Sequence, residues 1–546
     1  MFKNHPRGLI VLFFTEMWER FGFYLMLGIF LLYMTDTAKN GMGFGRAKAS
    51  DIVGTYLALV YLTPFLGGLL ADRIMGYRRA IILGGLLMAA GYIGLAFPGL
   101  TAFWISIFLI IIGNGFFKPN ISTLVGNLYS DEKYKDHKDA GYNIFYMGIN
   151  IGAFTCNFVA AYLRNYYGWG YAFAAAGIGM IIGVIWFISG QKHIRHADVL
   201  RPTKPEDMPL SRIMYTVFIP LIGFGVIGWF IPGHVFGSDS TDAFVLACIP
   251  ITIFFLSLWW RASKEDRGPI AALLSIFGVV IIFWAIFHQN ATALTIWADN
   301  YTDRTLSATM EPAAETFGMV QTVNDSLREV PKLNAHGIPM VDDKGLVITE
   351  MGPDPYLNNL PKSRWPSDGE SLKLISTEIY QSVNPFFIII LTPLVVAFFS
   401  FLHRHKKEPS TPAKIAWGLV ITAASTLVMV GAVLVSGNGA VKSSDIWLIS
   451  SYGVITIGEL FLSPMGLSLV SKLSPPRITA LMMGGWFLAT SFGNKLSGVI
   501  AGLWDMIPNK SHFFLINFCG AMLAATAIFL MVRWLRRIVV EHTGSQ

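Results

Sequence analysis

Charged residues interrupt the first apolar stretch of this 546-residue sequence. Glu16, Glu19 and Arg20 stand within a run that otherwise has the character of a lipid-soluble helix. An ionised side chain at the centre of a bilayer costs about 2.5–3.5 kcal/mol on insertion scales, so such residues usually face a partner or a water-filled cavity. Helical spacing places Glu16 and Arg20 on one face, with Glu19 three residues after Glu16. We therefore expect the first helix to line a polar site.

Two further charges lie within later apolar runs. Lys118 has no acidic neighbour in its own run, so its nearest expected partners are Glu16 and Glu19 on another helix. Glu459 has no local cation, and an isolated buried carboxyl stays protonated unless a cation or a ligand stabilises its charge. Opposite charges on separate helices would suit a zwitterionic ligand. The alternatives are a static ion pair that fixes helix packing at Lys118 and a protonated packing residue at Glu459.

Uncharged polar and aromatic residues complete the candidate binding site. Asn150 and Asn384 can each donate and accept hydrogen bonds, which suits a peptide amide or terminus, although hydrogen bonding between helices is a serious alternative. Tyr24, Tyr61 and Trp486 could shape side-chain pockets. Aromatic residues at such positions more often serve packing, so these three rank below the others.

The composition is that of a polytopic membrane protein. Hydrophobic residues make up 53% of the chain and charged residues 14%, with a mean hydropathy of +0.53. The net charge of +7 is spread over several loops and forms no single basic patch, so we expect no nucleic acid partner. Cys156, Cys248 and Cys519 have neither the number nor the spacing of a disulfide framework or a metal site. We therefore expect neither a metal nor an organic cofactor.

Fourteen apolar runs are long enough to cross a bilayer, which requires about 20 residues each. Basic residues gather in alternate loops and at both ends of the chain, which places those loops and both termini in the cytoplasm. The basic start of the chain runs directly into a first span that is too long for a cleaved signal peptide. The predicted spans are 8–34, 52–71, 79–98, 102–127, 140–163, 168–189, 212–232, 242–260, 269–297, 376–402, 412–435, 445–471, 477–503 and 511–535.

Two six-helix halves account for twelve of these spans. We assign 1–190 to an N-terminal bundle and 266–540 to a C-terminal bundle, joined by a linker and an inserted helical hairpin at 191–265. The hairpin has no charged residue in the cores of its two spans and is expected to face lipid. Residues 298–375 form an acidic, proline-rich insertion on the extracytoplasmic side, either a small ordered cap or a loose loop. Within it, 338–348 has the pattern of a β-hairpin.

The loop between the second and third spans carries a motif rich in glycine and charge. The run 68–79 looks like the loop motif of the major facilitator superfamily and contains Asp72 and Arg73. Its glycines allow close helix approach, and Asp72 and the arginines can hold helix ends differently in different transport states. A solvated loop that simply follows the positive-inside rule is the alternative.

Several runs taken together resemble the proton-dependent oligopeptide transporter (POT) family of the major facilitator superfamily. They span nearly the whole chain except 298–375. The resemblance implies an all-α polytopic membrane protein with two six-helix bundles, here extended to fourteen transmembrane helices by the inserted hairpin. The matching residues are the first-helix pattern Glu16, Glu19, Arg20, Phe21 and Tyr24 and the runs 61–72, 113–120, 145–154, 381–385 and 458–468.

The resemblance also implies a mechanism. The family uses the carboxylates, the arginine and the lysine of this pattern for proton coupling and carboxylate binding, which points to Glu16, Glu19, Arg20 and Lys118. A proton that arrives at Glu16 or Glu19 would weaken its hold on Arg20 or Lys118, and the freed cation could bind a substrate carboxylate. The position of Glu459 is the one that the family uses for the amino terminus of the peptide.

Two residues depart from the pattern of the better-known peptide-transporting members. Leu27 stands where those members commonly carry a second arginine, so one carboxylate contact is missing. His288 replaces an acidic residue associated with proton coupling and gating; it either titrates in that role or serves as a neutral hydrogen-bonding residue. Pro385 and Pro464 are predicted helix breaks that permit bending between states.

The leading hypothesis is a proton-coupled symporter that imports di- and tripeptides or peptide-like solutes by alternating access. Leu27 and His288 favour a second hypothesis, a transporter of a modified peptide or a non-peptide organic anion. The third is a receptor on a transporter scaffold, with 298–375 as its recognition module. An enzyme is disfavoured because no nucleophile–base pair or metal cluster stands out. The expected partners are a small peptide, protons and the lipid bilayer, and the resemblance indicates a bacterial inner membrane.

Overall fold

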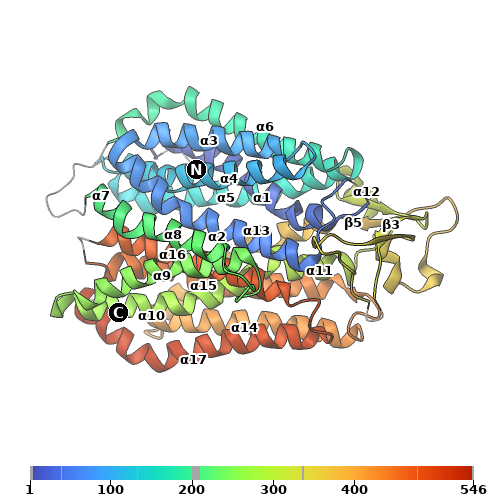
Figure 1. The fold of residues 1–546 in the computed structure, drawn as a ribbon. Coiled ribbons are helices and arrows are strands. Elements are labelled where there is room, and N and C mark those ends of the chain that lie inside the picture. The colour runs from blue at the N-terminus through green and yellow to red at the C-terminus, as the bar shows by residue number, and fades with distance from the viewer. Residues whose placement is uncertain are drawn as a thin grey trace.

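A helix lies at each of the fourteen predicted ranges in the computed structural model of the chain (Figure 1). The structure describes residues 4–38, 40–131, 133–199, 209–334, 337–475 and 478–543, so part of the predicted linker, 200–208, lies outside the described residues. Within the described ranges, eleven helices are long and apolar enough to cross a membrane, and the count of fourteen crossings stays a prediction. The long helices are α1 (Arg7–Thr35), α2 (Arg46–Leu70), α3 (Tyr77–Gly94), α4 (Leu100–Leu128), α5 (Lys138–Tyr166), α6 (Trp169–Ser189), α8 (Ile219–Trp229), α9 (Asp239–Trp260), α10 (Lys264–Phe287), α13 (Val383–Arg404), α14 (Thr411–Val435), α15 (Asp445–Leu473), α16 (Thr479–Gly502) and α17 (Lys510–Thr543).

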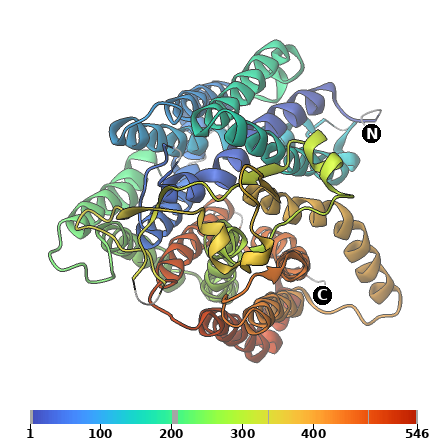
Figure 2. The same ribbon diagram turned by 90° about the vertical axis from the view of Figure 1, so that its right-hand side faces the viewer.

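The helices form two bundles that lie side by side (Figure 1). In the first, α1 packs against α5 and α6, and α3 packs against α4 and α6; in the second, α14 packs against α15 and α17, and α10 against α16. Figure 2 shows the bundles end-on, with the blue and teal helices on one side and the orange and red helices on the other. Because apolar side chains fill each bundle, the charged residues of the spans stand out as exceptions. The domain limits at 190 and 266 stay predictions.

The inserted hairpin packs against the second bundle with one face. Its first arm consists of α7 (Leu210–Ile213), the π-helical turn η5 (Met214–Phe218) and α8, and its second arm is α9. Val217, Ile251 and Phe255 are buried in the apolar core of the second bundle. Ile222 and Ile227 on α8 are about 60% exposed, as expected for residues that contact lipid. One face of the hairpin is therefore buried against the second bundle, and contact of its exposed face with lipid stays a prediction.

The insertion is an ordered cap at one end of the bundles, opposite the C-terminus (Figure 1). Strand β2 (Val320–Val323) pairs antiparallel with β5 (Leu372–Ile375), and β3 (Arg328–Pro331) pairs antiparallel with β4 (Thr349–Gly352). A small apolar cluster around Leu357 and Leu374 stabilises the cap. The remaining elements of this region are α11 (Ala293–Asn300), β1 (Thr302–Asp303), α12 (Glu311–Thr316), η7 (Pro355–Asn359) and η8 (Lys362–Arg364), and β1 pairs with β6 (Ser443–Ser444).

The β-hairpin predicted for 338–348 is present, and it contacts the first bundle. Val341 and Val347 face each other across the hairpin, and Gly345 closes the turn with a positive φ of 71°. Gly45, just before α2, donates its N–H to the Gly345 carbonyl at 3.0 Å, and Val347 donates to the Gly43 carbonyl at 2.7 Å. The insertion, although it belongs to the second half of the sequence, is therefore hydrogen-bonded to the first bundle.

Two predicted spans contain a 3-10 segment within the residues that the structure describes. The span predicted as 269–297 is divided, because α10 ends at Phe287 and a 3-10 turn, η6 (His288–Ala291), precedes α11. Another 3-10 segment, η9 (Thr377–Ser382), leads into α13, so Pro385 lies in the first turn of that helix and does not break it. Pro464 lies inside α15, which runs uninterrupted from Asp445 to Leu473.

Candidate functional site

Glu16, Glu19 and Arg20 form one buried ionic cluster on α1. Arg20 Nε lies 3.1 Å from Glu16 Oε1 and 2.5 Å from Glu19 Oε2, and Arg20 Nη2 donates to Glu19 Oε1 at 3.0 Å. The three residues are at most 3% exposed. Asn114 of α4 donates to Glu19 at 3.4 Å, a contact that the sequence analysis did not include, although Asn114 lies one helical turn before Lys118. The predicted cluster is therefore present, with Arg20 held by two carboxylates.

Lys118 contacts an aromatic ring and not a carboxylate. Its Nζ lies 3.8 Å from the centroid of the Tyr61 ring, which is a cation–π contact between α4 and α2. Among the described residues, Lys118 forms no ion pair within 4 Å, so the expected direct pairing with Glu16 or Glu19 is wrong. The reason is geometric, because Arg20 of the same helix already engages both glutamates. Lys118 keeps a weaker electrostatic interaction with them.

Tyr61 also contacts His288 of the second bundle. The two rings meet edge to face with centroids 6.3 Å apart. His288 is 7% exposed, and its Nδ1 lies 3.2 Å from the Trp284 carbonyl at the end of α10. Lys118, Tyr61 and His288 thus form a continuous row across the boundary between the bundles. The sequence pointed to each of these residues but not to their direct contact.

Glu459 lies in the second bundle beside two uncharged hydrogen-bonding groups. Asn384 of α13 donates to Glu459 Oε2 at 3.2 Å and to the Thr456 hydroxyl at 2.9 Å. No ion pair to Glu459 occurs within the described part of the chain, which agrees with the lack of a local cation in the sequence. Thr456 lies one helical turn before Glu459 on α15, and that spacing is the signal that could have identified it.

Tyrosine residues interact with both the cationic and the acidic groups. Tyr24 interacts electrostatically with Arg20 in its own bundle and with Tyr146 and Glu459. Tyr146, 44% exposed, lies one turn before Asn150 on α5, and Asn150 donates to the Tyr146 carbonyl at 3.0 Å. The sequence analysis quoted the run that contains Tyr146 without selecting it. The sequence suggested either substrate binding or hydrogen bonding between helices for Asn150 and Asn384. Asn384 makes such hydrogen bonds between helices, whereas Asn150 bonds within its own helix.

Trp486 is enclosed by packing contacts. It is 2% exposed, its ring lies close against Gly466, and its centroid is 6.4 Å from that of Phe277. A Cβ added at Gly466 would lie 1.9 Å from the indole, so glycine is required there for close approach. These contacts favour the packing interpretation, and a role in substrate binding stays a prediction.

The loop motif between α2 and α3 forms a latch through Arg78, one of the arginines of the motif, and not through Asp72 or Arg73. Arg78 Nε lies 2.8 Å from Asp198 Oδ2, and the Tyr77 N–H donates to Asp198 Oδ1 at 2.9 Å. Asp72 and Arg73 lie in the π-helical turn η1 (Ala71–Met75), and neither forms an ion pair with a residue that the structure describes. The latch therefore joins the start of α3 to the segment that follows α6.

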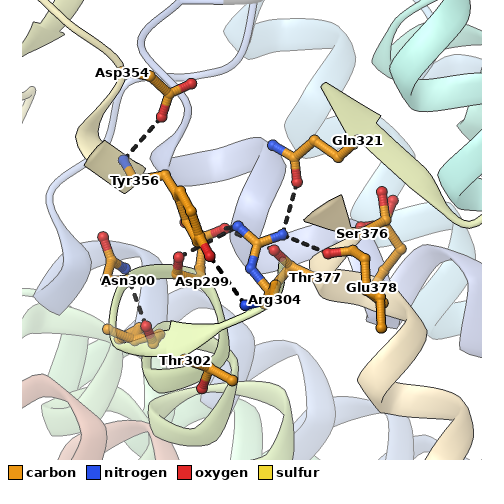
Figure 3. Close-up of polar contacts among 12 residues, drawn as sticks. Asp299, Asn300, Thr302, Arg304, Gln321, Asp354, Tyr356, Ser376, Thr377 and Glu378 are labelled. Carbon is orange, nitrogen blue, oxygen red and sulfur yellow. Dashed lines mark hydrogen bonds and ion pairs between the residues drawn. The ribbon is translucent and has the colours of Figure 1, made fainter. Parts of the chain in front are cut away.

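A polar cavity of about 760 Å³ lies between the insertion and the adjacent ends of both bundles. Figure 3 shows the Arg304 guanidinium at its wall, where Nη1 donates to Gln321 at 2.9 Å and to the Ile375 carbonyl at 2.7 Å. Burial, followed by the nearby charge of Arg304, lowers the pKa of Lys442 from its ordinary value of 10.5 to about 7. Burial would raise the pKa of Asp303, but hydrogen bonds from Arg364 and Thr305 lower it overall. The sequence analysis did not anticipate this cavity.

The arrangement can bind a dipolar solute. Arg20 and Lys118 provide positive charge in the first bundle, and Glu459 provides a carboxyl group in the second. Among the residues that the structure describes, no group of three or more His, Cys, Asp or Glu side chains could hold a metal ion. The chemistry that these groups support is electrostatic binding and proton transfer.

Comparison with known proteins gives a consistent result. The sequence model of PTR2, the POT family, matches residues 78–324 and 371–524. The chain is 31% identical over 538 residues to the uncharacterized transporter YclF of Bacillus subtilis, covering 97% of this chain and 94% of that protein. It is 31% identical to a di-/tripeptide transporter of Lactococcus lactis subsp. cremoris, with 94% and 93% coverage. It is 30% identical to the peptide transporter YePEPT of Yersinia enterocolitica, with 100% and 97% coverage.

Solved structures share the fold. One is a mutant peptide transporter POT in complex with alafosfalin, with a TM-score of 0.75, 30% identity and coverage of 98% of this chain and 96% of that one. Another is a POT family transporter in complex with 5-aminolevulinic acid, with a TM-score of 0.77, 26% identity and 98% coverage of each chain. These similarities confirm the predicted family resemblance and the predicted all-helical fold.

Proposed function

This chain belongs to the POT family, a family of transporters and not of enzymes, and we propose that it is a proton-coupled symporter for di- and tripeptides or peptide-like solutes. One observation carries the proposal. Arg20 and Lys118 on the first bundle and Glu459 on the second supply opposite charges on the two sides of a site that both bundles line. A short zwitterionic peptide complements that arrangement.

The carboxyl terminus of the peptide would bind on the first bundle. Lys118, which lies over the Tyr61 ring and forms no ion pair with a described residue, is the cation available to a carboxylate, whereas Glu16 and Glu19 hold Arg20. A proton on one of these glutamates removes half of the negative charge that holds Arg20 and releases its guanidinium towards the solute. Proton binding and carboxylate binding would thereby favour each other. Protons serve as the coupling ion, and the mechanism uses no other cofactor.

The amino terminus would bind on the second bundle. Glu459 has uncharged partners, so a positively charged amino group would supply the missing counter-charge. Asn384 orients the carboxylate, and the Tyr24 and Tyr146 side chains lie between the two charged ends. Asn150 supports Tyr146 from one turn further along α5.

His288 is proposed to take part in coupling. It lies beside Tyr61, whose ring also contacts Lys118, so a proton on His288 would repel the ammonium group across the boundary between the bundles. The charge that takes part in coupling would then be positive, whereas the acidic residue that the family pattern predicts at this position carries a negative charge. Leu27 and His288 keep a modified peptide or an organic anion as the second candidate solute. The POT structure in complex with 5-aminolevulinic acid supports the same alternative.

Alternating access would expose the site to each side of the membrane in turn. Hydrogen bonds between the bundles gather towards the insertion, as in Ser491 to the Ala58 carbonyl at 2.7 Å and Asn157 to Ser382 at 3.0 Å. The ion pair between Arg164 of α5 and Glu378 of η9, at 3.1 Å, lies on the same side. These contacts support an inward-facing state, closed on the side of the insertion.

The protein is an integral membrane protein. The distribution of basic residues supports cytoplasmic termini, and the bacterial relatives support a bacterial inner membrane. A receptor that uses the insertion 298–375 for recognition is the contrasting proposal. Deletion of the insertion tests it, because a receptor would lose its function, whereas a transporter that still folds would retain uptake.

Uptake by the purified protein in liposomes tests the proposed function. Labelled dialanine is supplied with an inward proton gradient, and the assay is repeated with an uncoupler. Accumulation that the uncoupler abolishes is expected for a proton-driven peptide symporter. Folded protein that takes up no dialanine would direct the search to modified peptides and organic anions.

A further inference from the structure

The inserted hairpin reaches an ion pair that joins the two bundles. Lys495 of α16 lies 2.6 Å from Asp51 of α2, and Lys495 Nζ also donates to Thr55 at 2.7 Å and to Ser240 at 2.8 Å. Ser240 and Thr241, in the first turn of α9, donate to Asp51 at 2.5 Å and 3.2 Å. Every hydrogen of the ammonium group therefore has an acceptor, and one of the acceptors belongs to the hairpin.

The end of the hairpin is built to hold these hydroxyl groups in place. Ser238 caps α9 by accepting a hydrogen bond from the Thr241 N–H at 3.2 Å. Asp242, 1% exposed, accepts from the Val235 and Phe236 N–H groups at 2.8 Å and 2.7 Å, which fixes the loop that leads into the helix. The first turn of α9 is thus pre-organised, and its positive end is directed towards the Asp51 carboxylate.

The helices that carry the ion pair are in close contact here. A Cβ added at Gly54 would lie 2.7 Å from the Gly498 Cα, so the backbones of α2 and α16 approach as closely as glycine permits. Asn494 donates to the Leu57 carbonyl at 3.2 Å. Access from the extracytoplasmic side requires α2 and α16 to separate, and this separation breaks the contact between Asp51 and Lys495.

We propose that the inserted hairpin is part of the extracytoplasmic gate, and that Ser240 and Thr241 stabilise the Asp51–Lys495 ion pair in the closed state. An ion pair taken out of water is favourable only where further hydrogen bonds satisfy its remaining donors and acceptors. The two hydroxyl groups supply these bonds while the gate is closed. When α2 and α16 separate, α9 can move with only one of these two helices. The hydrogen bonds that join Asp51, Lys495 and the first turn of α9 are then lost. The hairpin thus sets the balance between the inward-facing and outward-facing states.

Distance measurements between spin labels test this inference. The labels are attached to cysteines that replace Ala38, at the outer end of the first bundle, and Met506, which is 75% exposed in the loop between α16 and α17. Cys156, Cys248 and Cys519 are first replaced by alanine. In nanodiscs without substrate, the hydroxyl-free variant Ser240→Ala with Thr241→Val should gain a population at longer distance. The ratio of open to closed molecules should rise by roughly tenfold or more, because three hydrogen bonds to charged groups are lost and a single such bond corresponds to about tenfold or more.

A matched control removes one serine and one threonine hydroxyl group from another part of α9. Thr252 and Ser257 donate only to carbonyls of their own helix, Cys248 at 2.9 Å and Phe254 at 2.7 Å. Thr252→Val with Ser257→Ala should keep the distances of the parent protein. Asp51→Asn provides a second variant that opens the gate directly.

Two results would overturn the inference. In the first, the hydroxyl-free variant gives the same distances as the parent and the control. In the second, Asp51→Asn opens the outer side while the hydroxyl-free variant does not, which would show that the ion pair works without the hairpin. The inference rests on the alternating access proposed above. The distances are measured without substrate, so a failure of dialanine uptake would leave this test intact.

Discussion

Lys118 lies over the ring of Tyr61, with Nζ 3.8 Å from the ring centroid, and the opposite bundle meets the same ring through His288. This relationship differs from a simple ion-pair switch. No carboxylate of the described residues pairs with the ammonium group, so no ion pair has to break before it binds a solute. The aromatic ring holds the ammonium group in position by a weak attraction. Tyr61 therefore connects carboxylate binding in one bundle with the titratable group of the other.

Substitution of Tyr61 tests that connection. Tyr61→Phe keeps the ring and should retain most of the proton-driven uptake, whereas Tyr61→Leu removes the cation–π contact. A contact worth about 0.5–2 kcal/mol corresponds to a fall of roughly 2- to 30-fold in the rate of uptake at low solute concentration. Initial rates in liposomes measure the effect. Equal rates for the phenylalanine and leucine variants would show that the ring contact is not used.

Removal of Lys118 should separate coupling from movement of the carrier. We expect Lys118→Ala to abolish accumulation driven by a proton gradient, because it removes the cation that is available to the solute carboxylate while Glu16 and Glu19 hold Arg20. Counterflow exchange, which needs no net proton movement, should persist. Lys192→Ala, at an exposed lysine after α6, controls for the loss of one positive charge. Acid-driven accumulation by the Lys118 variant would contradict the coupling role.

Replacement of Glu459 should weaken binding of solutes with a free amino terminus. Glu459→Gln keeps the size of the side chain and a hydrogen-bonding group for Asn384, but it removes the counter-charge. The affinity for dialanine should fall by roughly tenfold or more, as expected for a charge-assisted hydrogen bond, while N-acetylated dialanine is unaffected. Competition assays measure both affinities, and Glu329→Gln at an exposed site of the insertion is the control. An unchanged affinity for dialanine would remove this assignment.

The role of His288 can be separated from simple hydrogen bonding. His288→Gln retains a donor for the Trp284 carbonyl but cannot be protonated, so proton-driven accumulation should be lost while counterflow remains. His288→Glu restores the acidic residue of the family pattern and should retain coupling, with a changed dependence of uptake on pH. Full accumulation by the glutamine variant would identify His288 as a neutral hydrogen-bonding residue.

The sequence predicted the helices well because the bilayer dictates their length. A run of about 20 apolar residues has few other stable arrangements in lipid, and each of the fourteen predicted ranges contains a helix. The break of the span at His288 was missed, since it depends on distant contacts. Gln289 donates to the Ser497 carbonyl of α16 at 3.1 Å, and Gln381 donates to the Asn290 carbonyl at 2.6 Å.

The residues of the candidate site could be predicted from the sequence, but the contacts between them could not. Buried charges are conspicuous in an apolar sequence, so Glu16, Arg20, Lys118 and Glu459 were identifiable. Which carboxylate holds which cation depends on rotamers and helix rotation, and charge counting gave Lys118 the wrong partner. Contacts with the linker were equally hidden, because Arg78 and Asp198 are 120 residues apart in the sequence.

Lys442, which lies against Tyr356 of the insertion, should make the stability of the protein depend on pH. Its pKa is about 7 in the folded protein, lowered mainly by burial, against an ordinary value of 10.5. Between these values the unfolded chain binds a proton that the folded chain has lost, so the free energy of unfolding should rise as the pH increases from about 7 to 10. Below pH 7 both states are protonated and this contribution is constant. Lys442 Nζ also donates to the Asn300 carbonyl at 2.9 Å and lies 3.9 Å from the centroid of the Tyr356 ring.

Lys442→Met should remove this part of the pH dependence. The methionine fills the same apolar surroundings without a charge, so the variant should melt at a higher temperature than the parent near pH 7. That advantage should shrink as the pH rises to 10, where the parent lysine is neutral in the fold. Thermal unfolding in detergent, followed by tryptophan fluorescence, measures the difference. Lys362→Met, at an exposed lysine of the insertion, controls for the change of charge. A difference in melting temperature that stays constant from pH 7 to 10 would show that burial of Lys442 does not control its protonation.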